Sequence, residues 1–198
     1  MIINSLEKVI QLKIVYYGPA MSGKTTSIKA LFNHFGKGEE IQSIESTVNR
    51  TLFFDYGTIT FQNKNWRLKL NIYTTTGQDF YLVTRPTVVR ATDGIIFVAD
   101  SYKEALRRNI TSWKELKKYF NKKTLNEIPK VIALNKQDLR EKFIVPHFLR
   151  EINYDSYENI SLIYTIALNG EGILESFEEI LRLILKKSYQ KTTLLKNN

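Results

Sequence analysis

The sequence contains no cysteine among its 198 residues, and this absence removes several kinds of site. Disulfides, thiolate metal ligands, cysteine nucleophiles and thioether or thioester lipid anchors are all excluded. Ile2 also excludes the N-terminal glycine that myristoylation requires. No apolar run approaches the length of a membrane-spanning helix, which is about 20 residues. Residues 1–4 lack the basic-then-apolar pattern of a secretory signal. We therefore expect a soluble, cytoplasmic protein without a lipid anchor.

Acidic side chains are outnumbered by basic ones, 20 against 29, which gives a net charge of +9. A basic balance favours phosphate-bearing partners: nucleotides, nucleic acid or anionic lipid headgroups. The lysines are scattered rather than gathered in the run expected of a nucleic-acid-binding arm. We therefore expect no nucleic acid partner and at most a weak electrostatic contact with membranes. Hydrophobic residues make up 43% of the chain and charged residues 25%, ordinary values for one globular domain.

The grouping of apolar residues predicts alternating strands and helices. Apolar runs that end in polar loops are typical of interior strands in a parallel sheet, and four such runs occur, at residues 12–17, 95–99, 131–134 and 160–168. Apolar residues at helical spacing occur in three segments, at 28–35, 106–120 and 173–184. Residues 51–61 and 66–74 have the pattern of an antiparallel hairpin.

These segments together predict a three-layer α/β domain with a mostly parallel sheet and one antiparallel edge hairpin. The predicted domain covers residues 1–187. Residues 188–198 are polar and are expected to form a tail that frays.

Residues 18–25 have the sequence Gly-Pro-Ala-Met-Ser-Gly-Lys-Thr and stand between a predicted strand and a predicted helix. In that context the pattern predicts a phosphate-binding loop, since glycines let the backbone wrap around phosphate oxygens and the helix turns free N–H groups toward the anion. Lys24 would reach the β- and γ-phosphates, and the Thr25 hydroxyl would ligate Mg²⁺. The loop residues expected to contact a nucleoside triphosphate are Gly18, Ala20, Met21, Ser22, Gly23, Lys24, Thr25 and Thr26.

The strand that ends near residue 134 is followed by Asn135-Lys136-Gln137-Asp138, which indicates the base. A carboxylate at Asp138 can accept from the ring N–H and the exocyclic amine of guanine, a donor pair that adenine does not offer. Lys136 can lay its alkyl stem over the purine face, and Asn135 can tie this loop to the phosphate loop. Further along, the amide of Ala167, followed by Leu168, could donate to the guanine oxygen.

A third polar segment, Thr74-Thr75-Thr76-Gly77-Gln78, follows the second strand of the predicted hairpin. Gly77 could deliver an N–H to a γ-phosphate, and Gln78 could orient the attacking water. The three loops together predict a protein that binds GTP or GDP with Mg²⁺.

With these motifs the chain resembles the small Ras-like GTPases, and more closely the MglA-type branch that controls bacterial polarity and gliding. The resemblance covers residues 1–187, including a short N-terminal extension. It rests on the phosphate loop, the switch segment, the base loop and three further blocks, which are Lys13-Ile-Val-Tyr-Tyr-Gly-Pro, Arg50-Thr-Leu-Phe-Phe-Asp-Tyr and Asp93-Gly-Ile-Ile-Phe-Val-Ala-Asp-Ser. The block that begins at Arg50 is the specific one, because Ras-like proteins at large do not carry it.

The resemblance implies hydrolysis of GTP to GDP and phosphate, with Gln78, Arg50 and Lys24 as catalytic residues. Arg50 would be an arginine finger supplied by the same chain, and Thr51 would reach Mg²⁺ and the γ-phosphate. Thr74 stands where most Ras-like proteins have the Asp that holds a metal-bound water, as in other MglA-type proteins. The metal shell is then one carboxylate short; Asp55 either compensates or is an exposed strand residue.

Two departures from the family pattern leave the reaction rate open. Ala20 replaces a usual glycine where the γ-phosphate, Gln78 and any arginine finger converge, and Thr75-Thr76 replace a usual Val-Pro. Two functions therefore remain: a GTPase switch that is slow unless a partner assists it, or a GTP-binding scaffold with negligible hydrolysis. The resemblance implies a Roadblock-domain, MglB-like partner that promotes hydrolysis, and the effector stays open.

Overall fold

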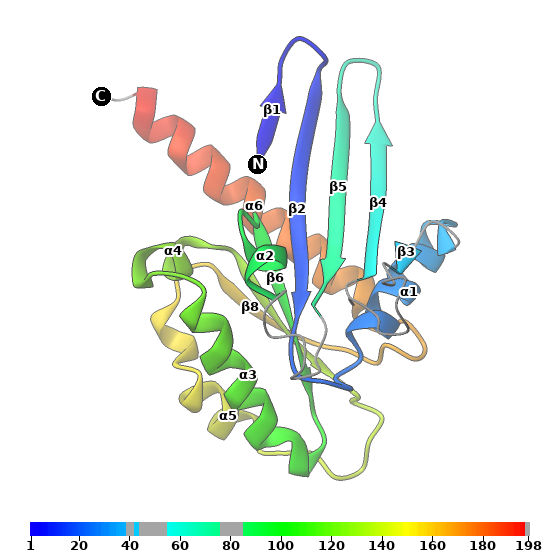
Figure 1. The fold of residues 1–198 in the computed structure, drawn as a ribbon, viewed down its shortest axis with the longest axis vertical. Coiled ribbons are helices and arrows are strands. Elements are labelled where there is room, and N and C mark those ends of the chain that lie inside the picture. Colours follow the sequence, from blue (N-terminus) through cyan, green and yellow to red (C-terminus); the bar gives the residue numbers. More distant parts are fainter. Residues whose placement is uncertain (39–41, 44–54, 76–84, 197–198) are drawn as a thin grey trace.

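The computed structural model describes residues 1–38, 42–43, 55–75 and 85–196. Within them, eight strands form one sheet that is flanked by helices (Figure 1). The strands are β1 (Ile2–Asn4), β2 (Val9–Tyr17), β3 (Gln42–Ser43), β4 (Asp55–Gln62), β5 (Arg67–Thr74), β6 (Gly94–Asp100), β7 (Lys130–Asn135) and β8 (Ile160–Tyr164). The helices are α1 (Lys24–His34), α2 (Arg85–Val89), α3 (Leu106–Lys118), α4 (Lys122–Glu127), α5 (Val145–Glu151) and α6 (Ile173–Lys196), with 3-10 turns η3 (Lys103–Ala105) and η4 (Tyr154–Ser156).

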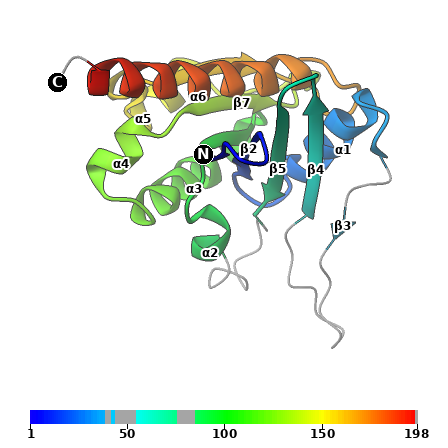
Figure 2. The same ribbon diagram turned by 90° about the horizontal axis from the view of Figure 1, so that it is seen from above.

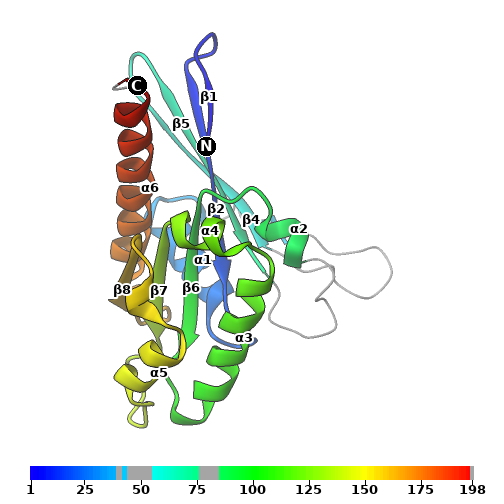
Figure 3. The same ribbon diagram turned by 90° about the vertical axis from the view of Figure 1, so that its left-hand side faces the viewer.

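The sheet is mostly parallel, as the sequence predicts. Its order is β3-β4-β5-β2-β6-β7-β8, in which β5, β2, β6, β7 and β8 are parallel and β4 runs antiparallel to β5. The predicted hairpin is therefore confirmed for the part of it that the structure describes. A second hairpin was not predicted: β1 pairs antiparallel with the first residues of β2, beside the stretch that β6 does not reach. Figure 3 shows both hairpins projecting past the body of the sheet.

The core lies on both faces of the sheet, because residues of β2 alternate between them. Ile14 and Tyr16 pack with buried residues of α1 and α6, while Val15 and Tyr17 pack with Trp113 of α3 and buried residues of α5. Figure 2 shows α6 along one face and α3 on the other. This is the predicted three-layer α/β arrangement. No helix among the described residues is long and apolar enough to cross a membrane.

Two boundaries differ from the predictions. The apolar run 160–168 is not an interior strand throughout, since β8 lies at the sheet edge and ends at Tyr164. Beyond it, the N–H of Ile166 bonds to the carbonyl of Glu171 (2.9 Å), which closes a loop. At the other end of the chain, α6 continues to Lys196, past the predicted domain boundary at 187, because no glycine or proline interrupts the segment. The predicted fraying of residues 188–198 stays a prediction.

Candidate functional site

The loop between β2 and α1 is shaped by two glycines with positive φ, Gly18 (+146°) and Gly23 (+101°). A β-carbon at Gly18 would lie 2.3 Å from the carbonyl oxygen of Val98, and one at Gly23 would lie 2.2 Å from Nδ2 of Asn135. Any other residue would therefore push the loop away from its neighbours. The Oγ of Ser22 is buried and has no hydrogen-bond partner among the described residues. A buried, unused hydroxyl in a tight backbone cradle fits a loop built to hold an anion.

Lys24, the first residue of α1, lies across this loop with only 6% of its surface exposed. Its Nζ donates to the carbonyls of Gly18 (2.9 Å) and Pro19 (2.7 Å). Burial, with a smaller contribution from the nearby Arg85, lowers the pKa of Lys24 to about 7. A phosphate at this position would favour the charged ammonium, because an opposite charge offsets desolvation. The lysine and the loop together fit the phosphates of a nucleotide.

The predicted metal ligand Thr25 lies beside a carboxylate. Its Oγ1 donates to Oδ2 of Asp55 (2.6 Å). Thr74 holds this carboxylate in place, since its Oγ1 accepts from the Asp55 N–H (2.8 Å) and donates to Oδ2 (3.2 Å). Asp55 is half-buried, so the geometry favours the role beside Thr25 over that of an exposed strand residue. β4 thus places a carboxylate beside the hydroxyls of Thr25 and Thr74. Hydroxyl and carboxylate oxygens are donors that suit Mg²⁺.

The base loop is joined to the phosphate loop by Asn135, as the sequence predicts. Its Nδ2 donates to the carbonyl of Ser22 (2.8 Å), while its Oδ1 accepts from the N–H of Ala167 (2.9 Å) and from Oγ1 of Thr165 (3.2 Å). The Ala167 amide is engaged by Asn135 here, so its bond to guanine stays a prediction. The carboxylate of Asp138 is exposed and unpaired among the described residues, and it is therefore free to accept from a base.

Lys136 is positioned by a carboxylate that the sequence analysis does not single out. Its Nζ donates to Oδ2 of Asp100 (2.8 Å), a fully buried carboxylate at the end of β6. Asp100 also pairs with Arg108 (2.5 Å) and accepts from the N–H of Tyr102 (3.0 Å). A carboxylate at the C-terminal end of a buried strand is the signal that could have identified it.

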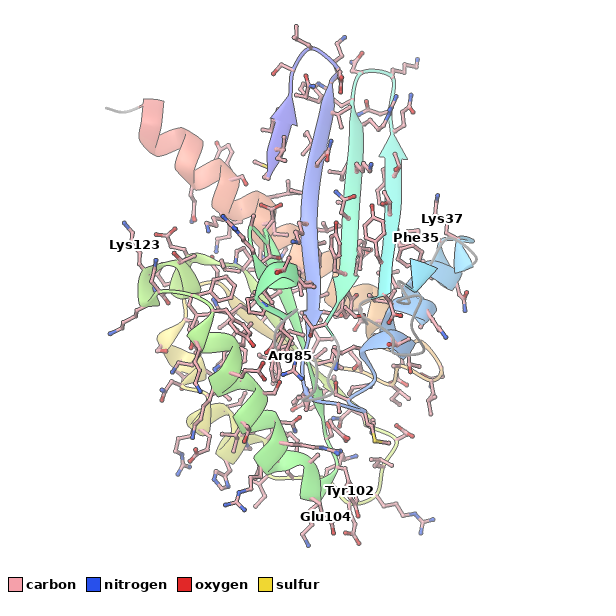
Figure 4. The ribbon with its side chains drawn as sticks, in the orientation of Figure 1. Phe35, Lys37, Arg85, Tyr102, Glu104 and Lys123 are labelled. Carbon is pink, nitrogen blue, oxygen red and sulfur yellow. The ribbon has the colours of Figure 1, made fainter. Side chains whose placement is uncertain are left out.

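Ala20 lines a cavity of about 410 Å³ next to the phosphate loop. The cavity is also lined by Arg85, the first residue of α2, whose Nη1 donates to Oε2 of Glu115 on α3. The hydroxyl of Tyr119 donates to the other oxygen of Glu115. Figure 4 shows Arg85 near the carboxyl ends of the central strands. This buried ion pair, which the sequence did not reveal, fixes the start of α2 beside the phosphate loop.

The remaining predicted residues divide into two groups. Thr26 is half-buried on α1, whereas Met21 and Leu168 are 81% and 83% exposed at the rim of the site. Arg50, Thr51, Gly77 and Gln78 lie outside the described residues, so their predicted roles stay predictions.

Comparison with known proteins agrees with this geometry. The chain matches the family model "Arf: ADP-ribosylation factor family" over residues 1–184. It is 27% identical over 180 residues to the Ras-related protein RABA1b of Arabidopsis thaliana, covering 90% of this chain and 77% of that protein. The chain therefore belongs to the Arf and Ras-like small GTPases, which bind guanine nucleotides as switches.

A further comparison assigns the chain to a more specific group within that class. The chain is 33% identical over 189 residues to the mutual gliding-motility protein MglA of Myxococcus xanthus (strain DK1622), covering 92% of this chain and 95% of that protein. This similarity identifies an MglA-type small GTPase, in agreement with the resemblance seen in the sequence.

Proposed function

We propose that the protein is a GTP-dependent switch that hydrolyses GTP to GDP slowly by itself and faster when a partner orders its switch segments. The observation that carries the proposal is the joined site: a buried Lys24 in a glycine cradle, tied through Asn135 to a loop that presents a free Asp138. The cradle with Lys24 fits a triphosphate, and the loop with Asp138 fits guanine. One hydrogen bond, from Asn135 to the carbonyl of Ser22, joins the two loops.

Each residue has a definite task in this proposal. Lys24 holds the β- and γ-phosphates, while Thr25, Asp55 and, in the GTP state, Thr51 hold Mg²⁺ or its water ligands. When bound, Mg²⁺ would neutralise charge on the phosphates. Gln78 orients the attacking water, and Arg50 stabilises the charge that develops on the transferred phosphoryl group.

A cytoplasmic location and a Roadblock-domain partner that assists hydrolysis are part of the proposal, and their support is the similarity to MglA. The second candidate function, a GTP-binding scaffold with negligible hydrolysis, is favoured by one observation. Ala20 lines the cavity next to the phosphate loop. In the proposed complex its methyl group would crowd the space around the γ-phosphate.

Single-turnover hydrolysis of bound GTP tests the proposal and separates the two candidates. The native protein is expected to hydrolyse GTP slowly but measurably, and Ala20→Gly is expected to raise the rate about tenfold, a change of about 1.4 kcal/mol in the barrier. A reaction that is undetectable in both proteins, with and without a Roadblock-domain partner, would establish the scaffold instead.

Asp55 is expected to support metal-dependent nucleotide retention. Asp55→Ala and Thr25→Ala should each speed the release of fluorescent GDP in Mg²⁺ buffer at least about tenfold, because outer-shell partners of metal ligands typically contribute that much. Thr58→Ala, on the same strand, is the matched control, and excess chelator should erase the difference between the variants. Native release from Asp55→Ala would remove this residue from the metal site.

A further inference from the structure

A large groove lies between the C-terminal end of α3 and the segments α4, α5 and η4. Its volume is about 1100 Å³, and its apolar lining comes from Phe120, Leu125, Leu149, Tyr154 and Tyr157. Leu125 is buried and the other four side chains are half-buried, so ring faces and alkyl groups form the floor. A cavity of this size with aromatic walls is typical of a site that receives another molecule.

The rim of this groove is strongly basic. Lys117, Lys122, Lys123 and Arg150 line it, against one carboxylate, that of Asp155. All four cations are exposed, and none of them is paired with a carboxylate in the part of the chain that the structure describes. Figure 4 shows Lys123 projecting from α4. Unpaired charges of one sign around an apolar floor favour an occupant of the opposite charge.

The two walls of the groove are held together by a buried lysine. Nζ of Lys130, at the start of β7, donates to the carbonyls of Leu125 and Ile128 (2.5 Å each) and lies 4.6 Å from the ring centroid of Tyr157. Burial lowers the pKa of Lys130 to about 7. The lysine thereby fixes α4 against the residues after η4. A pre-formed groove binds at a lower entropic cost than one that must be ordered first.

The groove lies away from the nucleotide site. The phosphate and base loops follow the C-terminal ends of β2 and β7, whereas the groove adjoins the end of α3 and the start of β7. Figure 1 shows α4 beside the C-terminal end of α3, and no residue of the phosphate or base loop lines the groove. A molecule in the groove therefore leaves both nucleotide loops uncovered.

We propose that this groove docks a short acidic segment of a partner protein, which inserts an aromatic or large aliphatic side chain between Tyr154 and Leu149 while its carboxylates meet the basic rim. A peptide fits better than a membrane surface, because the floor is concave and a bilayer presents a flat plane of headgroups. The floor accepts the apolar anchor, and the four cations select acidic sequences. The proposal does not depend on whether the protein hydrolyses GTP.

Selection from a phage-displayed library of random dodecapeptides on the full-length, GDP-loaded protein tests this. We expect enrichment of peptides with about three or more net negative charges and at least one aromatic or large aliphatic residue. The affinity of a selected peptide, measured by fluorescence anisotropy, should fall about tenfold or more in the double variant Lys122→Glu, Lys123→Glu. Glutamates in the first turn of α4 suit the helix dipole, so this variant should fold normally.

Matched controls separate the groove from net charge. Lys29→Glu with Lys64→Glu changes the net charge equally at exposed positions outside the groove and should alter peptide affinity less than about twofold. Tyr154→Ala should weaken binding about fivefold or more, whereas Tyr189→Ala, at a tyrosine 76% exposed on α6, should not.

Three results would overturn the proposal. One is the absence of acidic peptides among the selected sequences, and another is an equal loss of affinity in both double variants. The third is binding to vesicles that contain phosphatidylserine, abolished by the Lys122 and Lys123 substitutions, without peptide binding. That result would make the rim a membrane contact.

Discussion

Arg50→Ala is expected to lower the partner-stimulated rate of GTP hydrolysis by about 10³- to 10⁵-fold, the contribution of an arginine finger in related reactions. Phosphoryl transfer needs little covalent assistance, so its rate depends on an in-line water and on positive charge at the equatorial oxygens. Gln78→Ala should also lower the rate of GTP hydrolysis, because Gln78 orients the attacking water. Both residues lie outside the described residues, so the expectation rests on the switch segment for Gln78 and on the resemblance to MglA-type proteins for Arg50.

Turnover measured with and without a purified Roadblock-domain protein provides the test, and Arg67→Ala, at an exposed arginine of β5, is the matched control. Nucleotide affinity should be unchanged in Arg50→Ala, which separates catalysis from binding. Full partner-stimulated activity in that variant would show that the arginine finger comes from elsewhere. Fast turnover by the native protein alone would show that Ala20 does not slow GTP hydrolysis.

Asp138→Asn is expected to weaken GDP binding by about 2–3 kcal/mol or more, at least about 30-fold, because a charged acceptor for two guanine donors is lost. The native carboxylate is exposed and unpaired among the described residues, so its replacement should leave stability nearly unchanged. The loss would then report on the ligand rather than on folding.

Competition against a fluorescent guanine nucleotide measures this loss, and Asp155→Asn is the control at another exposed carboxylate. In the same assay the native protein should prefer GTP to ATP by a similar factor. Equal affinity of the native protein for ATP and GTP would contradict guanine recognition by Asp138.

Much of the fold could be predicted because its signals are local. The strands β2, β6 and β7 are buried on both faces, so they appear in the sequence as apolar runs that end where the polar loops of the site begin. The hairpin of β1 was missed, since three residues with a partly exposed pattern do not stand out from an extension. The end of α6 lies past the predicted boundary, because polar composition alone does not end a helix that contains no glycine or proline.

The site, too, has residues that local sequence motifs predict and contacts that they do not predict. Lys24 and Asn135 belong to contiguous motifs and could be assigned, down to the tie between the two loops. The Thr25–Asp55 contact joins residues 30 positions apart, and the Arg85–Glu115 pair does the same. Such contacts depend on how the elements pack, and no local pattern encodes them. Asp55 could therefore be raised only as an alternative.

Asp100 forms ion pairs with both Arg108 and Lys136, and this affects how the base loop would bind a purine. A buried carboxylate with a single cation holds that cation tightly, because separation leaves an isolated charge in a medium of low polarity. Asp100 has two cations, so Arg108 would still compensate its charge if Lys136 turned toward a base. Lys136 could therefore leave Asp100 to contact a base with only a small loss in the stability of the domain. Without Arg108, the same lysine would be bound to Asp100 and withheld from the nucleotide.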